Sequence, residues 1–207
     1  MRAAPKKPVA ERRTEILDVT CEVVIERGFA ATRVQDVAKR LDVSTGLIHY
    51  HFDNKDALLS AAFQLAAERD LERLERELGN EPGPVAKLLR VITLYAPEQA
   101  EPGWMMWIDA WGEALRNPIL RAISQDLDIA WMHHLEAVIS DGVAEGAFEC
   151  ADPHASAWRI AALLDGLAVQ VTVHDKAVTL DELRAWVLVA AAAEVGVDPS
   201  QFDRATR

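Results

Sequence analysis

Apolar residues recur every three or four positions along most of this chain and seldom alternate with polar residues for long. Between residues 9 and 27, for example, Ile16, Val19 and Val23 fall on one stripe of a helix. Prolines and glycines interrupt the pattern at intervals that suit helices. The sequence therefore predicts an all-α protein of about nine helices.

Breaks in the pattern set the expected bounds of these helices. Gly28 suits a C-terminal cap, Thr32 and Gln35 have the spacing of a capping box, and Asn54 can cap the helix that follows it. Asp152-Pro153 places a cap before a proline at the first helical position. We expect helices over residues 9–27, 34–41, 45–51, 55–78, 84–96, 103–116, 118–146, 153–174 and 180–195.

These helices fall into two expected domains. We expect a head of three helices over residues 1–54 and a body of six helices over residues 55–207. Residues 1–8 are a basic arm, which is either a solvated tail or a contact to phosphate or the minor groove of DNA.

The composition fits a cytoplasmic protein. Half of the 207 residues are hydrophobic, yet no stretch approaches the roughly 20 apolar residues of a membrane span. The basic start of the chain does not resemble a secretory signal, and Cys21 and Cys150 are too few and too far apart for a disulfide framework. We expect a soluble, reduced protein with no membrane association and no cofactor.

The charge is unevenly distributed. The whole chain carries 22 basic and 33 acidic residues, a net charge of -11. Residues 1–60 hold 10 of the basic and 9 of the acidic residues, so the acidic excess lies in the remainder. Only the first part of the chain could therefore face a polyanion.

Residues 44–52 read STGLIHYHF and carry two histidines. On a helix, His49 and His51 project about 200° apart and cannot bind the same metal ion. We expect neither a metal site nor a catalytic pair in this segment.

Two short helices joined by a tight connection instead indicate a helix-turn-helix. Its apolar contacts would come from Val37, Ala38, Leu41, Val43, Ile48 and Phe52. The side chains left at the surface would be Thr45, Leu47, His49, Tyr50 and His51. Hydroxyl, imidazole and phenol groups suit contacts to DNA bases and phosphates.

This part of the chain resembles the TetR family of transcriptional regulators. The resemblance covers residues 9–60 and is carried by Gly28-Phe-Ala-Ala-Thr32, Val34-Gln-Asp-Val-Ala-Lys-Arg-Leu41, Val43-Ser-Thr-Gly46, Ile48-His-Tyr-His-Phe52 and Lys55-Asp-Ala-Leu-Leu59. In the body, Ala161-Ala-Leu-Leu-Asp-Gly-Leu167 resembles the penultimate helix of members related to the choline regulator BetI.

The resemblance implies roles for single residues of the head. Contacts to base edges are implied for Gln35, Thr45, Gly46, Leu47 and His49. Contacts to phosphate are implied for Thr32, Tyr50, His51 and Lys55. Tyr50 and His51 could instead pack under the turn.

Two positions depart from the family pattern. Asp42 stands where the family usually has glycine in a left-handed turn, a conformation that aspartate tolerates better than most residues. His49 stands where the family often has tyrosine, which affects the expected base preference.

The body contains a face rich in tryptophan. Trp104, Trp107 and Trp111 follow helical spacing, Trp131 and His134 share a second stripe, and Trp158 shares a third with Asp165. Such residues usually fill a core, but indole N–H groups need partners, which favours a ligand cavity. The predicted wall is Trp107, Trp111, Trp131, His134, Trp158 and Asp165. It suits an apolar, aromatic or cationic ligand, although His134 could simply be a core histidine with its hydrogen bonds satisfied.

The last two expected helices are apolar on more than one face. One face can join the core of the chain, and the other needs a second subunit. The family resemblance implies the same arrangement, a four-helix dimer interface.

These features predict a ligand-responsive, homodimeric repressor that binds a palindromic operator on double-stranded DNA and is released by a small molecule. A helical scaffold for protein partners, or an enzyme using the tryptophan-lined cavity, are the alternatives. The polar surface of the head disfavours the scaffold. Because no nucleophile and base, metal cluster or phosphate loop is evident, we expect no enzyme.

Overall fold

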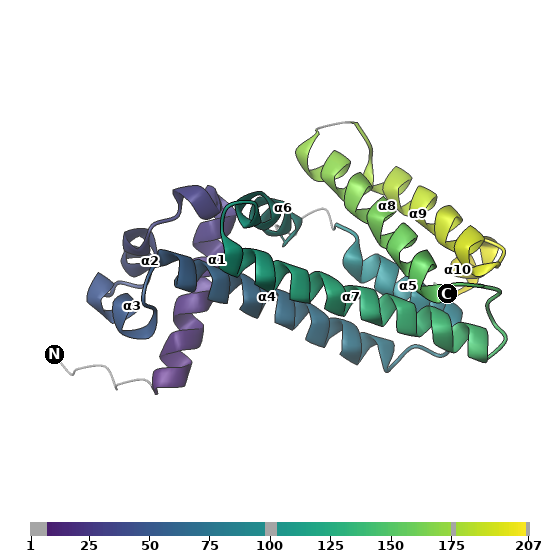
Figure 1. Ribbon diagram of the computed structural model, residues 1–207, viewed down its shortest axis with the longest axis horizontal. Helices are drawn as coiled ribbons and strands as arrows, with labels where there is room; N and C mark the ends of the chain where they lie inside the picture. The colour runs from purple at the N-terminus through teal and green to yellow at the C-terminus, as the bar shows by residue number, and fades with distance from the viewer. Residues whose placement is uncertain (1–7, 98–102, 175–176, 206–207) are drawn as a thin grey trace. The chain divides into compact units, whose positions relative to one another are not determined.

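A computed structural model describes residues 8–97, 103–174 and 177–205 (Figure 1). The described residues form ten α-helices and no strand, which confirms the all-α prediction. The helices are α1 Val9–Ala31, α2 Val34–Arg40, α3 Thr45–His51, α4 Lys55–Leu78, α5 Pro84–Tyr95, α6 Gly103–Ala114, α7 Pro118–Ala144, α8 Pro153–Val173, α9 Leu180–Val195 and α10 Ser200–Ala205. None of them combines the length and apolar character needed to cross a membrane. Residues 1–7 of the predicted basic arm lie outside the described residues.

Most of the expected helix ends are confirmed, with three corrections. The first helix does not end with a cap at Gly28: it is broken there and continues to Ala31, with Thr32 as its C-cap. The second helix begins at Val34 and is capped by Arg33, whose backbone N–H donates to Asp36, so the predicted capping box of Thr32 and Gln35 is wrong. α10 was not predicted; Phe202 within it is almost fully buried. Its start is marked by Asp198, whose carboxylate accepts from the backbone of Ser200.

The described chain divides into two compact units. The first takes the chain up to Glu68 together with Met105–Gln125, and the second takes Arg69–Trp104 and the chain from Asp126 onward. The predicted division at residue 54 into two functional domains stays a prediction.

The first unit contains the helix-turn-helix. α2 packs on α1 and on α3, and α6 lies beside α1 (Figure 1). Its core includes Ile16, Val37, Ala38, Ile48 and Phe52, with Leu41 and Val43 packed against it. The predicted apolar contacts of the head are therefore confirmed.

Local signals fix the turn between α2 and α3. Asp42 has a φ of 53°, so it adopts the left-handed conformation expected of it. The Ser44 hydroxyl then accepts from the Leu47 N–H at 3.3 Å and starts α3. Asn54 accepts from the Ala57 N–H at 2.8 Å and starts α4, as predicted.

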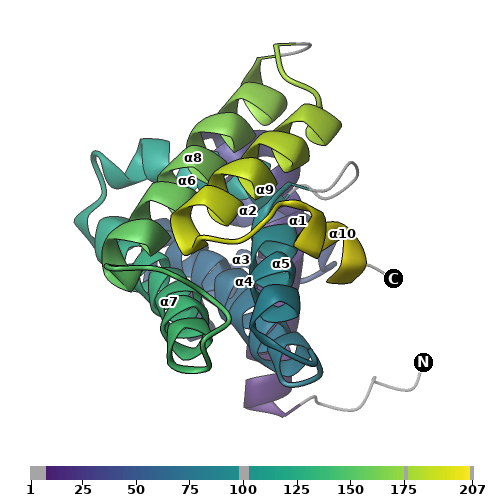
Figure 2. The same cartoon turned by 90° about the vertical axis from the view of Figure 1, so that its right-hand side faces the viewer.

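The second unit has its own core. It is built from α5, α7, α8 and α9, and it also includes Leu74 of α4 and Phe202 of α10. Figure 2 shows α8 and α9 running side by side, with α10 against α5. On α9, Leu183, Val187 and Ala191 are fully buried, so one apolar face of this helix belongs to the core of the chain.

Candidate DNA-binding face and effector site

The polar end of the helix-turn-helix forms a shallow groove of about 380 Å³. It is lined by Arg33, Val34, Gln35, Thr45, His49 and Lys55. Arg33 precedes α2, the next two residues begin α2, Thr45 and His49 belong to α3, and Lys55 begins α4. Four residues of the predicted DNA-contact set thus converge on one surface. Of the others, Gly46 and Tyr50 are exposed, whereas Leu47 and His51 are half-buried.

Tyr50 projects furthest. Its side chain is 73% exposed, and its ring meets the edge of the His51 ring at 5.1 Å between centroids. Packing under the turn, the alternative weighed for both residues, therefore does not describe Tyr50. A phenol held this far from the core can donate to a phosphate oxygen.

Thr32 occupies a different position. The side chain is fully buried, and its hydroxyl donates to the Gly28 carbonyl at 2.7 Å. Its backbone N–H donates to the same carbonyl at 3.1 Å. Both of its donors are used inside the protein, so we omit Thr32 from the proposed phosphate contacts.

Arg33 was missed by the sequence analysis. It is exposed, forms no ion pair with the residues that the structure describes, and borders the groove beside Gln35. A basic residue just before a helix that faces DNA was the available signal.

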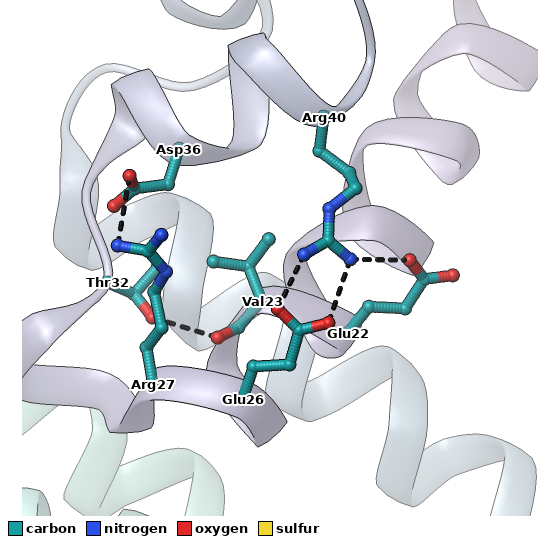
Figure 3. A network of polar contacts seen from close by, with 7 residues as sticks. All are labelled: Glu22, Val23, Glu26, Arg27, Thr32, Asp36 and Arg40. Atoms are coloured by element: carbon teal, nitrogen blue, oxygen red, sulfur yellow. Dashed lines mark hydrogen bonds and ion pairs between the residues drawn. The ribbon is translucent and has the colours of Figure 1, made fainter.

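Ion pairs hold α2 against α1 (Figure 3). The Arg40 guanidinium pairs with Glu22 and Glu26, and the Arg27 guanidinium lies 3.2 Å from the Asp36 carboxylate. The hydrogen bonds from Arg40 hold the pKa of the Glu26 carboxyl below its usual value. These exposed contacts orient α2 rather than supply much stability.

The second unit contains a cluster of three aromatic side chains. The Tyr95 ring meets Trp131 edge-on at 5.1 Å and Trp104 at 5.8 Å between centroids. The Trp104 indole N–H donates to the Tyr95 carbonyl at 2.8 Å. Three helices, α5, α6 and α7, therefore bring these rings together.

Two carboxylates accompany the aromatic cluster. The Tyr95 hydroxyl donates to Asp165 at 2.8 Å. Burial raises the pKa of the Asp165 carboxyl, and the hydrogen bond from Tyr95 opposes that rise. Burial and the nearby charge of Asp165 raise the pKa of the Asp128 carboxyl to about 7. Burial and the charge of Asp165 also raise the pKa of Tyr95, which therefore stays a hydrogen-bond donor.

Asp128 is the unusual member of this pair. It is half-buried, and among the described residues it has no hydrogen bond or ion pair. A carboxylate in such surroundings is costly to ionise unless a cation neutralises it. The aromatic cluster with Asp128 and Asp165 is called the acidic aromatic cluster below.

The predicted cavity wall is not assembled as one set within either unit. Trp131 and Asp165 belong to the acidic aromatic cluster, but Trp107 and Trp111 lie in the first unit, where Trp107 packs edge-on against Phe63 at 4.8 Å.

Two further residues of the wall have other surroundings. His134 Nε2 lies 3.5 Å from Glu75, and Trp158 is 47% exposed beside His154. His134 thus has a partner inside the protein, and Trp158 lies at the surface.

Tyr95, Trp104 and Asp128 were not predicted from the sequence as effector contacts. Asp128 stands three residues before Trp131 and so shares its helix face, which was a usable signal. Trp104 belonged to the stripe that contained Trp107. Nothing local marked Tyr95, because it meets Asp165 across 70 positions of sequence.

An all-α fold with an exposed helix-turn-helix defines a DNA-binding protein. Two family models match the chain: that of bacterial regulatory proteins of the tetR family over residues 16–62, and that of the C-terminal part of BetI-type transcriptional repressors over residues 84–196. The chain belongs to the TetR family of transcriptional regulators.

Individual relatives agree with this assignment. The HTH-type transcriptional regulator BetI of Paraburkholderia xenovorans is 30% identical over 172 residues, which cover 79% of this chain and 83% of BetI. The regulator PksA of Bacillus subtilis is 26% identical over 176 residues, covering 84% of this chain and 85% of PksA. These relatives are named as regulators of transcription and not as enzymes.

Solved structures show the same fold. A putative transcriptional regulator from Saccharomonospora viridis in complex with choline has a TM-score of 0.82 and 27% identity, covering 90% of this chain and 98% of that one. A TetR regulator from Haloarcula marismortui has a TM-score of 0.83 and 22% identity, covering 90% of this chain and 99% of that one.

Proposed function

We propose that this regulator is a homodimeric repressor that binds a palindromic operator and is released by a small organic cation of the quaternary ammonium type. The observation that carries the choice of ligand is the pair Asp128 and Asp165 beside three aromatic rings. Choline is the ligand of the Saccharomonospora viridis regulator, which supports this class of effector.

The physical argument for a cation has two parts. Tryptophan and tyrosine faces attract a quaternary ammonium group, which cannot form hydrogen bonds of its own. Asp128 and Asp165 supply negative charge in a poorly solvated place, where the attraction is stronger than in water. An anionic ligand would add to the repulsion that already raises the pKa of Asp128.

The proposed operator contacts come from the groove and from Tyr50. Gln35 can make two hydrogen bonds to adenine, and Thr45 and His49 can reach other base edges. Tyr50, Lys55 and Arg33 are placed to contact phosphates, which position the head without reading sequence. Gly46, Leu47 and His51 remain in the proposed contact set.

A gel shift on the DNA upstream of the protein's own reading frame tests this function. We expect a retarded complex on a palindromic segment, and its dissociation by choline or tetramethylammonium. A scaffold for protein partners, or an enzyme, would leave this DNA unshifted at moderate salt. A complex that resists both cations but dissociates with neutral aromatic compounds would reject the proposed ligand class.

Loss of a phosphate contact should weaken binding equally on all DNA sequences. We expect Tyr50→Phe and Lys55→Ala each to lower operator affinity about threefold to tenfold. Lys55→Ala should also lower the salt dependence of binding by about one unit of slope. Fluorescence anisotropy with the operator and with unrelated DNA measures both effects.

The control for this pair is Lys87→Ala, which removes the same charge from α5 in the second unit. Because Lys55 Nζ also donates to the Ala30 carbonyl at 2.8 Å, the unfolding temperature of each variant must be recorded. Unchanged affinity in both head variants would disprove the phosphate assignment.

Loss of a base contact should instead change sequence preference. We expect His49→Ala to alter the preferred base at one position of each half-site, while overall affinity for unrelated DNA stays the same. Selection of binding sites from a randomised operator library measures this preference. An identical preferred sequence for the variant and the wild type would exclude His49 from base reading.

A further inference from the structure

The end of α1 is broken at a glycine. Gly28 has a φ of 80° and a ψ of 163°, so the helical hydrogen-bond pattern stops there before one more short turn follows. Such a φ favours glycine over residues with a Cβ atom. The break leaves the N–H of Phe29 without its usual partner in the helix.

A carboxylate from a distant helix satisfies that N–H. Asp109 of α6 accepts from the Phe29 N–H at 2.6 Å, across 80 positions of sequence and within the first unit. A Cβ atom on Gly28 would lie 3.0 Å from the same carboxylate oxygen, so residue 28 has to be small for the contact to form. This bond is short and involves a charge, which places it among the stronger hydrogen bonds.

The segment that Asp109 holds is also bound by the start of α4. The Ala30 carbonyl accepts from Lys55 Nζ at 2.8 Å, and Lys55 lines the groove of the DNA-binding face. Thr32 closes the segment by donating to the Gly28 carbonyl. The short stretch from Gly28 to Thr32 therefore joins α1, α4 and α6 just before α2 begins.

α6 makes a second contact with the same helices. Phe63 of α4 packs edge-on against Trp107 of α6 at 4.8 Å and against Phe29 at 6.1 Å. A hydrogen bond also constrains the position of α6, because it weakens steeply when the donor–acceptor angle departs from its optimum. Asp109 is thus the contact that fixes the register of α6 against the end of α1.

We propose that Asp109 is the positioning residue through which α6 sets the geometry of the DNA-binding helices and passes effector binding to them. Trp104, the second residue of helix α6, has its indole in the acidic aromatic cluster, and Asp109 follows it five residues later, about 7.5 Å along the helix axis. Both residues therefore belong to one uninterrupted helix. The transmission of effector binding through Asp109 rests on the proposed function.

The test compares Asp109→Ala with Asp109→Asn and with Glu113→Ala. Asparagine keeps an oxygen that can accept from Phe29, whereas alanine does not. Glu113→Ala removes the same charge one turn further along α6 and serves as the matched control. Three quantities are measured: operator affinity, the fold-change in that affinity caused by choline, and hydrogen–deuterium exchange of residues 28–32.

We expect Asp109→Ala to bind operator about tenfold more weakly than Glu113→Ala and to respond to choline much less. Asp109→Asn should recover most of both properties. Exchange of the 28–32 segment should be faster in Asp109→Ala, and its unfolding temperature should be a few degrees lower than that of the control. A purely structural role would lower that temperature without changing the fold-change caused by choline.

The exchange measurement separates this proposal from the proposed function. If the wild type fails to bind DNA or to respond to choline, the proposed function is wrong. The role of Asp109 is then tested only by the hydrogen–deuterium exchange of residues 28–32. Equal exchange in Asp109→Ala and Glu113→Ala would then overturn the proposal. In a protein that does respond, an Asp109→Ala variant with wild-type affinity and wild-type response to choline would also overturn it.

Discussion

Replacing Asp128 or Asp165 with asparagine should lower the affinity for choline by about tenfold to hundredfold in each variant. Asparagine keeps the shape of aspartate but not its charge, so the aromatic rings alone would hold the cation. In Asp165→Asn the amide oxygen can still accept from Tyr95, which preserves the packing of that ring. Isothermal titration calorimetry measures both affinities directly.

Asp126→Asn is the matched control for these two variants. Asp126 is exposed on the same helix, two residues before Asp128, and so projects from a different face. The Asp126→Asn variant should bind choline with the same affinity as the wild type. Equal losses in Asp126→Asn and Asp128→Asn would show a general effect of charge, and no loss in either cluster variant would place the effector elsewhere.

Choline binding should also depend on pH. The Asp128 carboxyl has a pKa of about 7, and choline itself does not titrate, so the affinity should rise as pH increases through this value and then level off. Asp128→Asn should lose this pH dependence near neutrality. Calorimetry at several pH values measures it; an affinity that falls with rising pH would contradict the assignment.

The same carboxyl should make the free protein less stable at high pH. Its pKa is higher in the folded protein than in the unfolded chain, so the folded state binds the proton more tightly. Its contribution to stability therefore falls as pH rises from the unfolded pKa of about 4 to the folded value near 7. We expect Asp128→Asn to unfold at a higher temperature than the wild type, with a larger gain above pH 7 than near pH 5.

The helix-turn-helix could be read from the sequence because its determinants are local. Ser44 and Asn54 mark helix starts within three residues of the N–H groups they accept from, and Asp42 marks the turn by its own backbone preference. The phosphate contact predicted for Thr32 shows that local sequence signals can mislead. A threonine hydroxyl often bonds to a carbonyl four residues earlier, and this one does so instead of facing DNA.

The proposed effector site was harder to predict because it depends on packing between distant segments. Helical spacing groups Trp104, Trp107 and Trp111 on one stripe but does not say which neighbour each ring meets. Trp104 meets Tyr95, whereas Trp107 meets Phe63 in the other unit. Trp158 follows the same periodicity yet points outward, since spacing alone does not separate a core face from an exposed one.

Several large apolar residues of α8 and α9 are exposed. Trp158 and Val173 on α8 are 47% and 53% exposed, and Trp186 and Val189 on α9 are 50% and 58% exposed. Because the opposite face of α9 is already buried in the core, its exposed face is available to a second subunit, as the sequence predicts. Such residues on neighbouring helices suit a symmetric four-helix interface.

Val189→Arg should therefore convert the protein from dimer to monomer. In a two-fold symmetric interface the substitution occurs twice, and an unpaired charge is costly to bury, so the dimer Kd should rise by at least about a hundredfold. Val189 is a better position for this test than Ala191, because Ala191 is fully buried and arginine there would disrupt the core of the subunit itself. Light scattering at micromolar concentration gives the mass, and circular dichroism shows whether the monomer remains helical.

Ser140→Arg is the control for added charge, since Ser140 is exposed on α7. This variant should remain a dimer and bind operator as the wild type does. Val189→Arg should bind a single half-site as well as the wild type, but it should lose the additional affinity that the full palindrome provides through simultaneous contacts. A wild-type protein that is monomeric at micromolar concentration, or a Val189→Arg variant that stays dimeric, would show that subunits do not pair through this face of α9.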